Sequence, residues 1–175
     1  SVSRTYGAAN PSIDASTLYG GPASYVFGPA GDGGLVTPTV STSATVTSNV
    51  DDYAFTGDGS LNSDLGVVYR VVYTGVLSVT PAPLTASLSG AISKVYDGTL
   101  TAALAADGYT FTGVLNDDVV SLSAPSAGSF DTKNVGAEKT VTFTGLSLTG
   151  AGASNYSLAT TELEGDIGEI TPASL

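Results

Sequence analysis

The seven residues SKVYDGT, at positions 93–99, place a lysine, a tyrosine and an aspartate within four positions. All three side-chain types can take part in acid–base or nucleophilic chemistry. In a strand, however, Lys94 and Tyr96 would share one face and Asp97 would point to the other, so the three groups could not converge on one substrate atom. We expect instead a turn, in which Asp97 accepts local backbone N–H bonds and Gly98 takes a conformation that other residues resist.

A related phrase, SRTYGAAN, stands near the start of the chain and favours the structural interpretation. Arg4 takes the place of Lys94, the aromatic residue and the glycine recur as Tyr6 and Gly7, and the aspartate is missing. A catalytic aspartate would not be dispensable in the second copy of a motif. We therefore predict that the rings of Tyr6 and Tyr96 anchor the opening strand and turn of two related modules.

The composition argues against catalysis and against two classes of partner. The 175 residues include no His and no Cys, so the commonest general base and the thiolate nucleophile are both missing. Sixteen acidic and five basic side chains give a net charge of -11, which repels phosphate backbones and anionic lipid headgroups. We expect a protein that is not an enzyme, binds no nucleic acid and does not insert into a membrane.

Two loops carry oxygen ligands of the kind that Ca²⁺ prefers. The first loop offers Asp58, Asn62 and Asp64, and the second offers Asn116, Asp117 and Asp118. Neither loop has the alternating ligands and the closing bidentate glutamate of an EF-hand, and solvated loop acids are the simpler explanation. Ca²⁺ is thus a candidate ligand, and no other cofactor is expected.

Exposed aromatic rings could bind glycans by stacking on sugar rings. The chain has no Trp, and Tyr19, Tyr25 and Tyr53 lie near Gly-rich stretches, which makes them the candidate ligand-binding residues. Some extracellular β modules also carry an amide cross-link between a lysine and an asparagine. Lys94 and Asn155 would be the pair here, although two solvated surface side chains are the favoured alternative.

A closing phrase, Thr-Pro-Ala-x-Leu, occurs at 80–84 and again at 171–175. Both copies follow a stretch of alternating apolar residues, and proline cannot donate to a sheet ladder, so we expect a last strand to end and a linker to begin there. Tyr-Gly or Tyr-Asp-Gly, an aromatic strand, an Asn-Val turn and a Phe-Thr-Gly strand end also recur in the same order. These repeats predict two modules, 1–83 and 84–175.

Strand signals dominate both modules. Segments rich in Val, Thr, Tyr and Phe are separated by clusters of Gly, Asn, Asp and Pro, and they lie at 39–47, 67–73, 118–123 and 139–145. The helix-like stretches are 12–18 and the Ala-rich 99–107. We predict a mostly β protein, in which each module is a small immunoglobulin-like β-sandwich or a mixed β-sheet domain with room for one short helix.

Linked motifs stand in a characteristic order in the second module: KVYDGTLTAAL, DDVVSLS, GSFDTKNVGAEKTVTFTG, NYSL and ITPA. In this order they resemble the YDG repeat domain of large bacterial adhesins of the filamentous-haemagglutinin type. The first module opens RTYGAANP and closes GVLSVTPAPLT, and it is similar to the MBG (YGX-type) repeat of the same proteins. Its segment DLGVVYRVVYTG departs from the usual Asn-Tyr pattern before the last strand.

The resemblance implies a secreted array of tandem modules held at the bacterial cell surface, outside the cell or associated with the outer membrane. No catalytic residues belong to the family pattern. We expect a non-catalytic stalk segment that serves adhesion or biofilm formation, with neighbouring repeats of the same chain as its partners. The alternative is a module that binds carbohydrate or exopolysaccharide of the host or biofilm matrix, with Ca²⁺ assisting. Residues 1–20 lack a charged-then-apolar signal pattern, and we expect the chain to be a segment of a longer protein.

Overall fold

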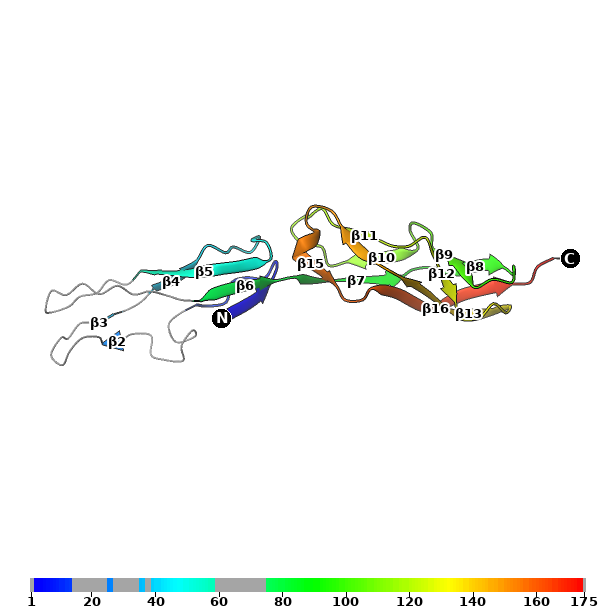
Figure 1. Ribbon diagram of the computed structural model, residues 1–175, viewed down its shortest axis with the longest axis horizontal. Helices are drawn as coiled ribbons and strands as arrows, with labels where there is room; N and C mark the ends of the chain where they lie inside the picture. The colour runs from blue at the N-terminus through cyan, green and yellow to red at the C-terminus, as the bar shows by residue number, and fades with distance from the viewer. Residues whose placement is uncertain (1, 14–24, 27–34, 37–38, 59–74, 175) are drawn as a thin grey trace. The chain divides into compact units, whose positions relative to one another are not determined.

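The computed structural model describes residues 2–13, 25–26, 35–36, 39–58 and 75–174 (Figure 1). The chain divides into two compact units, Ser1–Pro81 (unit 1) and Ala82–Leu175 (unit 2). Strands make up nearly all the regular structure in the described residues, so the chain has a mostly β fold. No helix in these ranges has the length and apolarity that crossing a membrane requires.

Unit 1 is built around one mixed sheet with the strand order β1-β6-β5-β4. Its strands are β1 (Val2–Thr5), β4 (Thr39–Thr42), β5 (Asp51–Asp58) and β6 (Val76–Thr80), and a separate antiparallel pair is formed by β2 (Tyr25–Val26) and β3 (Leu35–Val36). β1 runs parallel to β6, whereas β5 is antiparallel to both of its neighbours. The alternation in β6 buries Leu77 and Val79, and Leu77 packs with Ala44 and Phe55 in the core of the unit.

Unit 2 contains a five-stranded mixed sheet with the order β8-β16-β13-β12-β9, a three-stranded sheet β10-β7-β15 and the pair β11-β14. Its strands are β7 (Ala82–Leu88), β8 (Ile92–Val95), β9 (Thr101–Ala103), β10 (Tyr109–Thr112), β11 (Ser121–Ser123), β12 (Ala127–Phe130), β13 (Gly136–Thr144), β14 (Ser147–Thr149), β15 (Tyr156–Leu158) and β16 (Glu162–Thr171). The parallel pairs are β8 with β16 and β7 with β15. The edge strands β8 and β9 also contact each other, so the five-stranded sheet curls.

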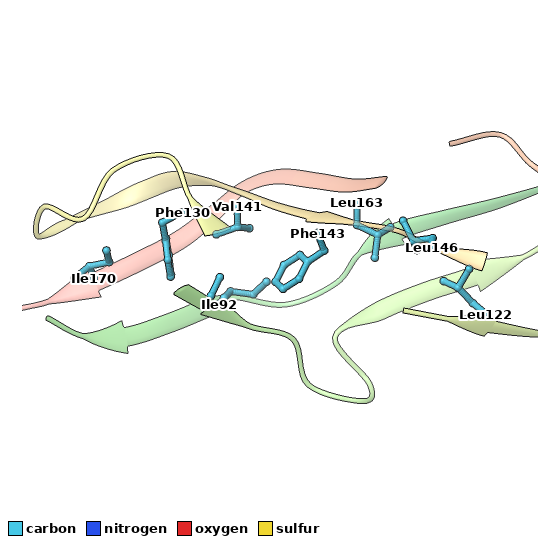
Figure 2. Packing of buried hydrophobic residues seen from close by; sticks show 9 residues of the cluster. Ile92, Leu122, Phe130, Val141, Phe143, Leu146, Leu163 and Ile170 are labelled. Atoms are coloured by element: carbon cyan, nitrogen blue, oxygen red, sulfur yellow. The ribbon is translucent and has the colours of Figure 1, made fainter. Parts of the chain in front are cut away.

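The core of unit 2 is a continuous apolar cluster along the inner face of the curled sheet (Figure 2). Phe143 and Val141 come from β13, and Leu163 and Ile170 come from β16; each of the four is at most 1% exposed. Side chains of β7 and β10, including Phe111, pack against this cluster from the three-stranded sheet. Period-two alternation in the strands therefore aims one face of each sheet at a shared interior.

The two units repeat one sheet arrangement. In unit 1 the first strand lies parallel to the last (β1 and β6), and β5 and β4 follow in antiparallel order. In unit 2 the same order and directions hold for β8, β16, β13 and β12. The repeated sequence phrases thus correspond to a repeated arrangement of strands.

The prediction of a helix over 99–107 is wrong, because β9 (Thr101–Ala103) occupies this stretch. Ala102 is 1% exposed and pairs with Gly128 of β12, so sheet pairing and burial override the helix propensity of alanine. A short 3₁₀ turn, η1 (Ala153–Asn155), lies elsewhere in the unit. Of the other predicted helix, 12–18, Ser12 and Ile13 are not helical, and 14–18 fall outside the described residues.

The expected linker after the first Thr-Pro-Ala-x-Leu phrase is not found. Only Pro81 stands between the last residue of β6, Thr80, and the first residue of β7, Ala82. Ala82 and Leu84 are 4% and 0% exposed, and they pair with Tyr156 and Leu158 of β15. The proline interrupts the hydrogen-bond ladder for one residue, and the chain then continues as a strand of unit 2.

Candidate functional site

The Tyr-Asp-Gly segment folds into a turn at the end of β8, and this turn brings two of its polar side chains together. Lys94 Nζ lies 2.8 Å from Asp97 Oδ1, because the strand ends at Val95 and the turn folds Asp97 back over it. Asp97 also accepts the N–H of Thr99 at 2.9 Å and its hydroxyl at 2.8 Å, and Gly98 has φ of +78°. The expectation that Lys94 and Asp97 could not meet held only for a continuous strand.

Hydrogen bonding within this turn leaves Lys94 poorly suited to act as a nucleophile. Its ammonium donates to Asp97, to the carbonyl of Thr99 and to the hydroxyl of Thr99, and it lies 5.5 Å from the centre of the Phe130 ring. The hydrogen bond from Lys94, together with those from Thr99, lowers the pKa of Asp97 from 3.8 to about 2. A lysine with three acceptors and a strongly ionised carboxylate stabilise a turn. A carboxyl group with so low a pKa is not poised for proton transfer near neutral pH.

The two tyrosines of the repeated phrase take equivalent backbone positions but differ in exposure. The N–H of Tyr6 donates to Thr80 O at 2.8 Å, and the N–H of Tyr96 donates to Thr171 O at the same distance. Gly7 and Gly98 both have φ of +78°, so both turns use the left-handed backbone conformation that glycine tolerates. Tyr6 is 3% exposed, whereas Tyr96 is 40% exposed, so the ring of Tyr96 is not buried in the core as an anchor.

The Asn116–Asp117–Asp118 loop is a tight turn joined to the core by a tyrosine. Asn116 and Asp117 have φ of +56° and +55°, and the N–H of Asp118 donates to Leu115 O at 3.0 Å, which is the geometry of a type I′ turn. The hydroxyl of Tyr156 lies 2.7 Å from Asp118 Oδ2 and accepts the N–H of Leu115 at 2.9 Å. One carboxylate of the predicted calcium loop therefore already has a hydrogen-bond partner.

The other predicted calcium loop falls mostly outside the described residues. Asp58 is the last residue of β5, and Asn62 and Asp64 lie beyond the described part of the chain. Across residues 2–13, 25–26, 35–36, 39–58 and 75–174, no group of three His, Cys, Asp or Glu side chains could hold a metal ion. Ca²⁺ binding stays a prediction.

The three tyrosines proposed to bind sugars are described only in part. Tyr53 is half-buried beside the Phe55 and Leu77 core, and its hydroxyl donates to Asn49 O at 2.9 Å. Tyr25 lies in the short strand β2, and Tyr19 falls outside the described residues. Of the three, only the ring of Tyr53 has described contacts, and these join it to its own unit.

An open hollow of about 360 Å³ lies in unit 2, where Leu104, Tyr109, Leu122 and Pro125 contribute to its lining. The Tyr109 hydroxyl is 3.4 Å from Leu122 O. Tyr109 is the only titratable side chain in this lining, so the hollow offers no acid–base pair for catalysis.

Lys94 and Asn155 are not brought together for an amide cross-link. Lys94 lies in β8, Asn155 directly precedes β15, and these strands lie at opposite ends of unit 2 (Figure 1). The ammonium of Lys94 is instead held by Asp97 and Thr99.

Thr99 and Tyr156 matter to these turns, although the sequence analysis did not single them out. A threonine two residues after an aspartate is a recognisable signal, because its N–H is the donor that such an aspartate accepts in a turn. Tyr156 belongs to the Asn-Tyr-Ser-Leu motif, but its partner Asp118 is 38 positions away, and no local pattern indicates that contact.

Comparison with known proteins bears on unit 2. The family model of the YDG domain matches residues 80–163, from the last residue of β6 into β16. No curated protein and no solved structure matches the chain. Residues 80–163 are therefore a YDG domain.

Proposed function

We propose that this chain is a non-catalytic repeat segment of a secreted bacterial surface adhesin, in which it acts as an extended stalk in adhesion or biofilm formation. Residues 80–163 contribute a YDG domain. Unit 1 would contribute a related module of the MBG type. The segment would lie outside the cell or at the outer membrane, with neighbouring repeats of the same chain as its partners.

The observation that carries this proposal is the repeated sheet arrangement. Each unit places an early strand, β1 in unit 1 and β8 in unit 2, parallel to its last strand and beside it, and both sheets continue with two antiparallel strands in the same order. Modules of one design that follow each other with a single residue between their strands suit a tandem array.

The use of the polar side chains also supports a structural role. Lys94 and Asp97 stabilise the turn that ends β8, and Asp118 accepts a hydrogen bond that fixes the Leu115 turn. Catalytic groups usually have pKa values matched to proton transfer near neutral pH, whereas the pKa of Asp97 is held at about 2.

A glycan array distinguishes the stalk from a carbohydrate-binding module. The full chain should bind no glycan above background, with or without Ca²⁺, because a spacer has no sugar site. Reproducible binding that Tyr25→Ala weakens in a chain with an unchanged circular dichroism spectrum would contradict the proposal. Binding that requires Ca²⁺ would contradict it as well.

A further inference from the structure

The Thr-Pro-Ala-x-Leu phrase occupies the same structural position each time it occurs. In unit 1, Arg4 of the first strand pairs with Val79 of the last, and the Thr80 hydroxyl donates to Arg4 O at 3.2 Å. In unit 2, Lys94 pairs with Ile170, and the Thr171 hydroxyl donates to Lys94 O at 3.3 Å. Each phrase thus begins at the end of a last strand, where that strand pairs with a parallel strand of its own unit, β1 in unit 1 and β8 in unit 2.

The first copy of the phrase shows what its later residues do. Past Pro81 they form the start of β7, where Ala82 and Leu84 are buried within unit 2. The second copy repeats the proline, alanine and leucine after Thr171, with Ser174 in the place of Pro83, and its Ala173 is exposed. Ala173 and Leu175 therefore stand at the sequence positions whose equivalents, Ala82 and Leu84, are buried.

Exposed apolar side chains lie near the end of β16, where this second copy begins. We call Val95, Tyr96 and Val135 the exit surface; they are 58%, 40% and 49% exposed. Val95 pairs with Thr171, and Val135 directly precedes Gly136, which pairs with Ile170. The N–H of Tyr96 donates to Thr171 O at 2.8 Å.

The exit surface lies where β8 and β16 end and the chain leaves unit 2 (Figure 1). A gathering of large apolar side chains at one place commonly marks an interaction site, whereas single exposed ones do not. The backbone position of Tyr96 does not by itself require an exposed ring, since Tyr6 at the equivalent position is only 3% exposed. The exit surface therefore has the apolar character of an interaction site.

We propose that the exit surface docks a further β unit of the YDG type, whose first strand begins with residues 173–175. This inference rests on the proposed function, because it supplies the contact by which one repeat would hold the next. We expect the docked unit to have the same fold class as unit 2. The first Thr-Pro-Ala-x-Leu phrase leads into β7 of unit 2, and the second copy would lead into the docked unit.

The test adds such a unit and measures its effect on the exit surface. A longer chain is made from residues 1–172 followed by a second copy of residues 82–174. The protein has no cysteine, so one introduced thiol is an unambiguous probe of accessibility. Val135→Cys reports on the exit surface, and Val119→Cys, at a residue that is 69% exposed and lies outside it, is the matched control.

Docking should slow the reaction of the Val135→Cys thiol with a maleimide by about ten-fold or more in the longer chain, because reaction then requires transient opening. The Val119→Cys thiol should react at the same rate in both lengths. Adding Tyr96→Asp to the longer chain should restore fast reaction at position 135, since a charge would have to be buried.

Two results would overturn the inference. One is an equal rate for Val135→Cys in both chains while circular dichroism shows that the added copy is folded. The other is an added copy that does not fold when it is joined directly after Pro172, because the proposal requires the first strand of the next unit to begin there. Glycan binding would refute the stalk without altering thiol protection, so the two failures are distinguishable.

Discussion

Leu84→Ala tests whether the closing phrase is part of the core of unit 2. Leu84 is 0% exposed, pairs with Leu158 and lies against Gly113, so the substitution leaves a cavity among packed strands. A buried leucine replaced by alanine lowers the free energy of unfolding by about 3 kcal/mol. In a unit of about 90 residues this corresponds to a fall in Tm of roughly 12–24 °C.

Differential scanning calorimetry of the full chain measures the fall, and hydrogen exchange of peptides from β13 and β16 assigns the transition to unit 2. Leu100→Ala is the matched control, because Leu100 is 45% exposed. The control should change the free energy of unfolding by no more than about 0.5 kcal/mol. Equal, small shifts for both variants would refute the assignment of β7 to the core of unit 2.

Three further predictions concern a close strand contact and the two turns. Gly168→Ala should destabilise unit 2 by about 1–3 kcal/mol in urea unfolding, because a Cβ there would lie 2.8 Å from a backbone oxygen of β13. The control Gly165→Ala should not destabilise the unit in this way, since a Cβ at that position has only ordinary contacts beyond 3.4 Å. The Asp97 carboxylate binds its proton more weakly when folded, so its stabilisation should be complete above about pH 4 and lost as the pH falls towards 2. In urea titrations across this range, the difference from Asp97→Asn should shrink, and a constant difference would contradict the ion pair. Tyr156→Phe should cost about 1–2 kcal/mol and speed exchange of the Leu115 amide; unchanged exchange would exclude that hydrogen bond.

The strand content of the fold was predictable because it depends on local alternation. In β6, the buried Leu77 and Val79 alternate with more exposed neighbours. Their period-two spacing is visible in the sequence. The strand in the Ala-rich stretch was not predictable, because Ala102 is held there by pairing with Gly128, which comes 26 positions later. Local propensity cannot report that pairing.

The turn chemistry was partly predictable for the same reason. Asp97 accepts the N–H of a residue two positions later, and that spacing is visible in the sequence. The contact between Lys94 and Asp97 depends on where the strand ends, and the exposure of Tyr96 depends on what surrounds the turn. Sequence similarity between the two phrases therefore indicates equal backbone positions without indicating equal burial.

Small-angle X-ray scattering of the full chain tests the stalk most directly. A compact globule of 175 residues would have a radius of gyration of about 16 Å. Two units of about 90 residues, each with a radius of gyration of about 12 Å, give more than about 19 Å when they stand end to end. The stalk predicts the larger value and a long tail in the distance distribution, with a forward scattering that corresponds to one chain. A radius near 16 Å for a monomer would contradict it.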